Sequence, residues 1–128
     1  MICCADVYFY SLHRLCHLNP VLWEIHKYHH TGNTSAVKAL DAHYIEHLVI
    51  NLGSVWFGVF LLQQIEIIIN IYVLYIWIIL TTINTCINHT VNLNTTRKHI
   101  LHHKFLTCNY GVGFYLMDRL CNTYRKSI

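Results

Sequence analysis

The sequence predicts an all-α integral membrane protein, with one transmembrane hairpin and a cytosolic helical cap rich in histidine. Three observations support this fold class. Hydrophobic residues make up 55% of the chain and charged residues only 12%, against roughly 25% charged residues in typical soluble domains. Glu66 is the only formal charge between Leu48 and Thr96. The chain has 11 histidines against 6 acidic residues, and most of the histidines lie in clusters outside the apolar stretch.

A chain of 128 residues is expected to form a single domain. We expect this domain to cover residues 1–128 in three parts. Residues 1–47 hold the first two histidine clusters, residues 48–88 form the transmembrane hairpin, and residues 89–128 hold the third cluster and a C-terminal cap. The net charge of +3 is small and its basic residues are scattered, so the sequence excludes nucleic acid as a partner.

Two helices are expected before the apolar stretch. The first runs from Asp6 to Leu18 and ends at Asn19-Pro20. Asn19 can cap the following helix, and Pro20 can occupy its first turn. The second helix is expected from Val21 to His30, ended by Thr31-Gly32-Asn33.

The apolar stretch predicts two antiparallel spans, from Leu48 to Leu62 and from Ile65 to Ile87. A bilayer core of about 30 Å needs about 20 apolar residues per helix. One long tilted helix, or a buried hairpin of a soluble protein, remains the alternative. The isoleucine-rich run from Ile67 to Ile79 offers no polar face to water, which favours the membrane. Every Lys and Arg lies outside the spans, so the positive-inside rule places both flanks in the cytosol.

Three histidine clusters lie on the predicted polar helices, the last of which can be capped by Thr95 or Thr96. Residues three or four apart share one helical face, so each cluster presents at least two imidazoles together. With His89 at the end of the second span, the clusters offer more nitrogens than a single ion accepts. Two metal ions are the economical interpretation, and imidazole suits iron, zinc, copper or nickel. The clusters are His13-Arg14-Leu15-Cys16-His17, His26-Lys27-Tyr28-His29-His30 and His99-Ile100-Leu101-His102-His103.

A lone histidine is more often a hydrogen-bonded residue than a metal ligand, and we keep that interpretation for His43 and His47. Packing does not explain three clusters on one side of a membrane module, because polar rings are costly to bury. None of the clusters contains the H-E-x-x-H motif of zinc peptidases, which disfavours a zinc-dependent hydrolase. All-nitrogen ligation of two metals fits oxygen activation better.

The order of these motifs resembles the fatty acid hydroxylase superfamily, which includes sterol desaturases, methyl sterol oxidases and lipid hydroxylases. The residues from Asp6 to Arg14 are similar to its D-x-x-F-Y-W-x-H-R motif, and those from Leu22 to His30 to its L-W-x-x-H-K-x-H-H motif. Near the C-terminus, Asn109-Tyr110-Gly111 and Asp118 to Thr123 resemble N-Y-G and D-R-L-F-G-T. The likeness covers nearly the whole chain.

The resemblance implies an endoplasmic-reticulum-type membrane enzyme whose metal site faces the cytosol. It implies two non-haem iron ions, for which zinc is a substitute, and O2 as co-substrate. Electrons would come from a separate donor such as cytochrome b5 and its reductase. The implied reaction is hydroxylation or desaturation of a sterol or fatty acyl lipid, with no catalytic residue beyond the ligands. The implied metal ligands are His13, His17, His26, His29, His30, His89, His99, His102 and His103.

The sequence departs from the family pattern at several places. Family members usually have another membrane hairpin before the first cluster, whereas only 12 residues precede His13. The expected hairpin would then be the remnant of a four-helix core, and a second chain could supply the missing one. Asn122 replaces the glycine of the last motif, and the segment from Ala42 to Glu46 resembles A-x-H-P-x-E without its proline. A truncated, non-catalytic metal-binding relative, or a subunit that needs a partner, is therefore the alternative function.

Overall fold

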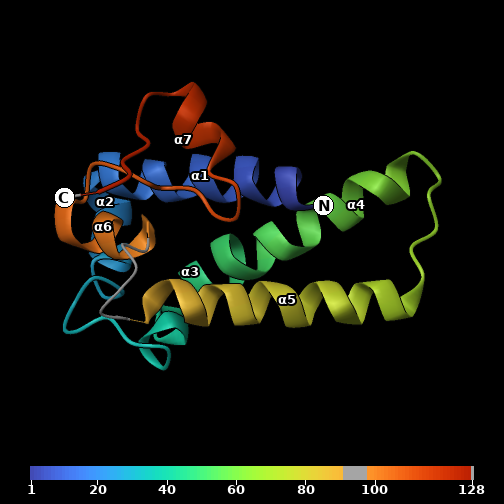
Figure 1. The fold of residues 1–128 in the computed structure, drawn as a ribbon, viewed down its shortest axis with the longest axis horizontal. Helices are drawn as coiled ribbons and strands as arrows, with labels where there is room; N and C mark the ends of the chain where they lie inside the picture. Colours follow the sequence, from blue (N-terminus) through green and yellow to red (C-terminus); the bar gives the residue numbers. More distant parts are fainter. Residues whose placement is uncertain (91–97, 128) are drawn as a thin grey trace.

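The computed structural model describes residues 1–90 and 98–127, and within them the chain is all-helical without a strand, as predicted. Figure 1 shows α5 running along one edge of the molecule, antiparallel to α4, with α1 on the other side of α4. Two helical segments are long and apolar enough to cross a membrane, which fits the predicted membrane protein. The elements are α1 (Ile2–Leu18), α2 (Pro20–His26), η1 (Lys38–Leu40), α3 (Tyr44–Glu46), η2 (His47–Leu52), α4 (Gly53–Gln64), α5 (Ile71–His89), α6 (Lys98–Phe105) and α7 (Leu116–Leu120).

The break between α1 and α2 lies where the sequence predicts it. Oδ1 of Asn19 accepts hydrogen bonds from the backbone N–H groups of Val21 and Leu22, at 2.9 and 3.1 Å. Pro20 occupies the first turn of α2, so the predicted cap is confirmed. The predicted start of α1 at Asp6 is too late, because the helix begins at Ile2.

The predicted end of α2 at His30 is wrong, because the helix ends at His26 and residues 27–30 form turns. The N–H of His29 donates to the carbonyl of His26, and that of His30 donates to the carbonyl of Lys27. These bonds span three residues instead of four and tighten the chain after the helix. Gly32 follows with a φ of +82°, a conformation that glycine adopts without strain.

The first candidate span is longer than predicted and the second is shorter. A continuous helix over Tyr44–Gln64 combines α3, η2 and α4, and both it and α5 have a mean hydropathy of 1.6. η2 is a π-helix that the sequence pattern does not predict. The second span begins at Ile71, not at Ile65, because Oδ1 of Asn70 caps it by accepting from the N–H of Tyr72 at 2.9 Å. Residues 65–70 therefore form a connection longer than the predicted tight turn.

Two glycines bring α1 close to α4. A Cβ atom on Gly53 would lie 2.7 Å from the hydroxyl oxygen of Tyr8, and one on Gly58 would lie 3.0 Å from Cα of Met1. The ring of Tyr8 also packs on Phe57, with their centroids 5.0 Å apart. Small residues let helix backbones approach closely, so α1 lies tightly along the first candidate span.

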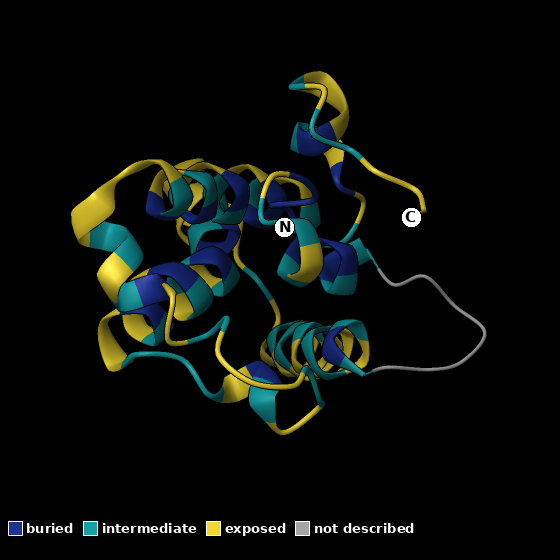
Figure 2. Cartoon of the chain, turned by 90° about the vertical axis from the view of Figure 1, so that its left-hand side faces the viewer, coloured by how far each residue is buried: buried dark blue, intermediate teal, exposed yellow. Residues whose placement is uncertain are grey.

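The interior of the fold is polar at its centre. Figure 2 shows buried residues on the inward sides of the helices and exposed residues on the outward sides. The sequence-predicted cap of α6 at Thr95 or Thr96 lies outside the described residues. Apolar side chains remain exposed along α5, as expected for a helix that faces lipid. The largest fully buried side chains are His13, His26, His102, Asn109, Asp6 and Asp118.

Candidate metal centre

Nine of the 11 histidines gather in two groups where the ends of α1, α2, α5 and α6 meet. Within each group, one ring nitrogen from every residue lies within 4.8 Å of the others. These are the nine histidines that the motif resemblance implies as ligands, and the structure brings all of them together. The five-histidine group is His13, His17, His26, His30 and His102, and the four-histidine group is His29, His89, His99 and His103.

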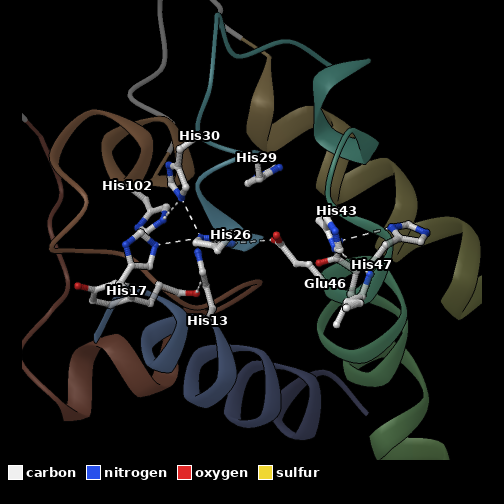
Figure 3. A network of polar contacts seen from close by, with 12 residues as sticks. His13, His17, His26, His29, His30, His43, Glu46, His47 and His102 are labelled. Carbon is white, nitrogen blue, oxygen red and sulfur yellow. Dashed lines mark hydrogen bonds and ion pairs between the residues drawn. The ribbon is translucent and has the colours of Figure 1, made fainter. Parts of the chain in front are cut away.

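The Nε2 atoms of the rings converge within each group, and Figure 3 shows the five-histidine rings turned toward one another. A metal–imidazole bond of about 2.05 Å separates two ligand nitrogens by about 2.9 Å at a right angle and by about 3.3 Å at a tetrahedral angle. The observed spacings are therefore those of ligands around a metal ion. They are 3.0 Å for His17–His26, 2.9 Å for His26–His30, 3.3 Å for His30–His102, 3.1 Å for His29–His89 and 3.2 Å for His99–His103.

Backbone carbonyls fix the opposite nitrogen of three rings. Nδ1 of His13 donates to the carbonyl of Tyr110 at 2.6 Å, and Nδ1 of His102 donates to that of Cys108 at 2.9 Å. In the four-histidine group, Nδ1 of His89 donates to the carbonyl of Thr85 at 2.9 Å. A carbonyl only accepts, so the proton sits on Nδ1 and the lone pair of Nε2 points into the group. Within the described part of the chain, Nε2 of His13 is buried without a hydrogen-bond partner, and a cation would satisfy it.

Burial keeps the rings outside the candidate spans neutral. Desolvation lowers the pKa of His17 to about 3, that of His26 to about 4 and that of His103 to about 3. Desolvation and the neighbouring imidazoles also hold the pKa values of His99 and His102 well below the usual range. Neutral imidazole is the form that ligates metals. Buried nitrogen lone pairs that point at one another cost free energy unless a hydrogen-bond donor or a cation lies between them. The two histidine groups therefore fit two metal ions.

Glu46 is a site residue that the sequence pattern placed only at the end of a weak motif. Its side chain is buried, and Oε1 lies 2.9 Å from Nδ1 of His26, within ion-pair range but outside hydrogen-bond geometry. Its other oxygen, Oε2, has no hydrogen-bond partner among the described residues. One sequence signal could have identified it, because Glu46 is an acidic residue at the start of an apolar span and such residues are rarely unpaired.

Two buried carboxylates hold the loop that contacts His13 and His102. Asp118 accepts from the N–H groups of Tyr110 and Gly111, at 2.9 and 2.7 Å, and Asp6 accepts from that of Val112 at 2.9 Å. A Cβ atom on Gly111 would lie 2.5 Å from Oδ1 of Asp6 and 2.8 Å from Oδ2 of Asp118, so only glycine fits there. The N-Y-G and D-R-L motifs therefore hold the loop that orients the rings of His13 and His102.

The departure at Asn122 has a simple physical explanation. Its φ is +57°, in the left-handed region where glycine is the usual residue. Asparagine is among the side chains that adopt this conformation most readily, so it can replace the glycine of the family motif.

His43 and His47 lie outside both groups. Nδ1 of His43 accepts from the N–H of Ile45 at 3.3 Å, at the start of α3, and Nδ1 of His47 lies 3.5 Å from the amide nitrogen of Asn51. His43 therefore caps α3, and the polar neighbour of His47 lies in its own helix.

Two hollows border the histidine groups. The first, here called the helix cavity, has a volume of about 350 Å³ and is bordered by α1, η2, α4 and α5. His29, His89 and His99 of the four-histidine group line it. The second is an open depression of about 430 Å³ that includes His30 and His103 in its wall. The groups can therefore be approached from an apolar side and from the protein surface.

Comparison with known proteins shows what this chain is similar to. The chain is 29% identical to methylsterol monooxygenase 1 of Rattus norvegicus, over 92% of this chain and 43% of the relative. It is 37% identical to fatty acid hydroxylase domain-containing protein 2 of Homo sapiens, over 84% of this chain and 32% of the relative. The chain thus spans less than half the length of these relatives. No solved structure matches it. The family model for fatty acid hydroxylase matches residues 1–123, and the chain belongs to that family.

Proposed function

We propose that this chain is a membrane-bound oxygenase that hydroxylates or desaturates a sterol or fatty acyl lipid, using O2 and electrons from outside. The observation that carries the proposal is the pair of histidine groups, with nine ring nitrogens converging beside an apolar cavity. The names of the two relatives, a methylsterol monooxygenase and a fatty acid hydroxylase domain protein, support the lipid and the oxygen chemistry.

The histidine groups would hold two iron ions, with zinc as a substitute. A bound iron pair would supply the activation of O2 and the redox capacity that side chains lack. The chain's own contribution is to present neutral imidazoles and to keep their orientation fixed. His13 and His102 are held from behind by carbonyls of a loop that Asp118 organises, and His26 has the carboxylate of Glu46 beside it. Such outer contacts orient ligand rings and raise their basicity.

The two apolar helices would anchor the site at the surface of an endoplasmic-reticulum-type membrane, with the metals toward the cytosol. We further propose that residues 1–47, 48–88 and 89–128 act as one domain. An electron donor such as cytochrome b5, with its reductase, would approach from the open depression, because His30 and His103 each bring one histidine group to its wall. A second chain that supplies a further membrane hairpin is another partner under this proposal.

The decisive experiment loads the full chain, in lipid nanodiscs, with iron and measures metal content and lipid products. Two iron ions per chain are expected, together with a hydroxylated or desaturated lipid when O2 and an electron-donor system are added. For a hydroxylated product, ¹⁸O₂ should label the new oxygen. His29→Ala should abolish product, because His29 belongs to the four-histidine group that lines the helix cavity.

His43→Asn is the matched control, since His43 lies outside both groups and asparagine can still cap α3. It should keep product formation close to that of the unchanged chain. A chain that binds metal but oxidises no lipid under these conditions would contradict catalysis and support the non-catalytic metal-binding relative.

A further inference from the structure

α5 stands apart from the rest of the helical bundle along much of its length. It packs little against α1 and α4 and makes its main contacts with α6 and η1 at one end. The indole N–H of Trp77 donates to the carbonyl of Val55 at 3.0 Å, the only hydrogen bond between α4 and α5, both of which the structure describes in full. The helix cavity occupies the space between these helices.

Trp77 lies at the far end of this cavity. Among the lining residues it is the one on α5 most distant in sequence from His89, and Val55 is the last lining residue on α4. A helix rises about 1.5 Å per residue, so Trp77 lies about 18 Å from His89 along α5. The bond between Trp77 and Val55 therefore bridges the gap between the two helices where the cavity ends.

Along this length, few polar side chains of the cavity wall lack a hydrogen-bond partner. The hydroxyls of Thr81 and Thr85 donate to the carbonyls of Trp77 and Thr81, at 3.0 and 2.9 Å. Ser54 donates to the carbonyl of Asn51 at 2.7 Å. These polar side chains on the wall are bonded to their own helices and leave mainly apolar surface toward the cavity. Such a wall suits hydrocarbon.

The end of the helix cavity beside the histidine groups is polar instead. Across residues 1–90 and 98–127, the buried side-chain nitrogen and oxygen atoms without a hydrogen-bond partner belong to the histidine groups and to Glu46. The wall of the cavity is thus apolar near Trp77 and polar near the histidine groups. The unpartnered atoms are Nε2 of His13, Nδ1 of His26, His29 and His30, and Oε2 of Glu46.

We infer that the helix cavity binds a single-chain lipid with its polar end beside the histidine groups and its methyl end against Trp77, whose indole limits the length of chain that fits. Calling this lipid a substrate rests on the proposed function. The inference adds that Trp77 is the residue that sets the length of the substrate. It requires no chemistry at Trp77 itself.

Tryptophan fluorescence can locate the chain without any turnover. The protein has 3 tryptophans, so the double variant Trp23→Phe/Trp56→Phe leaves Trp77 as the only indole. In nanodiscs, a fatty acid brominated near its methyl end should quench Trp77 more strongly than one brominated near its carboxyl end. The unbrominated fatty acid should reverse this quenching by competition. The matched variant Trp23→Phe/Trp77→Phe reports on Trp56, which is 45% exposed and outside the cavity lining, and should show no such competition.

The length limit is tested with unbranched fatty acids of increasing length, competing against the brominated probe. The Trp77 variants used here also carry Trp56→Phe. Displacement of the probe is measured by mass spectrometry of the lipid that the protein retains. Trp77→Ala should shift the longest competing chain upward, whereas Trp77→Phe, which keeps a ring, should leave the limit close to its original length. Trp56→Ala in the otherwise unchanged chain should not move it.

Equal quenching by both brominated acids, or an unchanged length limit in Trp77→Ala, would overturn the inference. Saturable quenching of Trp77 in a chain that forms no oxidised lipid would contradict the proposed function alone. Oxidised product without the expected quenching would contradict the inference alone.

Discussion

The carbonyl of Tyr110 accepts a hydrogen bond from Nδ1 of His13 at 2.6 Å, although the two residues are 97 positions apart in the chain. Tyr110 is held in place because its N–H donates to Asp118 at 2.9 Å. An acidic residue near the C-terminus thereby fixes the orientation of a ring on α1. Changes at this loop should act on the metal site without removing a ligand.

Asp118→Asn should weaken metal retention and lower stability. The carboxylate accepts from the N–H of Tyr110, the N–H of Gly111 and the hydroxyl of Thr123, and an amide cannot accept all three. We expect a loss of about 2 kcal/mol in unfolding free energy and about a tenfold loss in metal affinity. Thermal unfolding and metal content after dialysis against a chelator measure both effects.

Glu24→Gln is the control for Asp118→Asn. Glu24 forms an exposed ion pair with Lys27, and such pairs contribute little to stability. The role given to Asp118 is wrong if both variants retain metal equally well.

Glu46→Gln should reduce metal affinity with little change in the fold. The variant replaces the carboxyl group 2.9 Å from Nδ1 of His26 with an amide of the same shape. We expect about a tenfold loss in affinity, as is typical when an outer contact of a ligand is changed. Competition with a coloured chelator provides the measurement. Glu66→Gln, at an exposed position in the connection before α5, should behave like the unchanged chain, and a similar loss there would argue against a specific role for Glu46.

The metal-free protein should lose stability as pH falls below about 6.5, the ordinary pKa of histidine. The folded pKa values are lower, about 3 for His17 and about 4 for His26 and His29, because burial disfavours the charged rings. The unfolded chain therefore gains protons first, and folding stability decreases between pH 6.5 and the folded pKa values. At pH 5.5 each such ring would cost about 1.4 kcal/mol.

Unfolding temperatures by circular dichroism, at pH 7.5 and 5.5 with a chelator present, test this dependence. Bound metal should raise the unfolding temperature at both pH values without removing the dependence, because the unfolded chain still gains protons between pH 7.5 and 5.5. His43→Asn should leave the dependence unchanged. Equal unfolding temperatures at the two pH values in the metal-free protein would be incompatible with the neutral buried rings described above.

Gly111→Ala should destabilise the protein by about 2 to 3 kcal/mol, because the added methyl would collide with carboxylate oxygens of Asp6 and Asp118. Gly32→Ala is the comparison, since no atom of residues 1–90 or 98–127 lies within 4 Å of a Cβ there and the strain of its φ of +82° is the expected cost. That variant should lose about 1 kcal/mol. Chemical denaturation in detergent gives both values, and a larger loss at Gly32 would reverse the expected order.

Local patterns in the sequence predict the elements that depend on neighbouring residues. The all-helical class follows from composition, and the junction at Asn19-Pro20 follows from capping chemistry. The convergence of the three clusters could be expected because their spacing predicts imidazoles that share a helical face. The motif resemblance is confirmed by the match to residues 1–123.

Other features depend on contacts between distant parts of the chain and leave no local pattern. The N–H of Val112 reaches Asp6 across 106 positions, and no periodicity reveals that pairing. The π-helix at His47–Leu52 has no composition signal either. His29 and His30 fit a helical pattern, yet the chain leaves the helix at His26 and carries them into different groups. Tertiary packing has here overridden local preference.

The polar centre of this fold has a consequence for how the protein matures. Its most deeply buried side chains are polar, and the imidazoles among them gain little from leaving water unless a hydrogen-bond donor or a cation joins them. A newly synthesised chain that lacks metal would therefore open at this end more often than a metal-loaded one, within reach of quality-control proteases. The amount of folded protein in a cell would then follow the supply of metal, before any question of turnover arises.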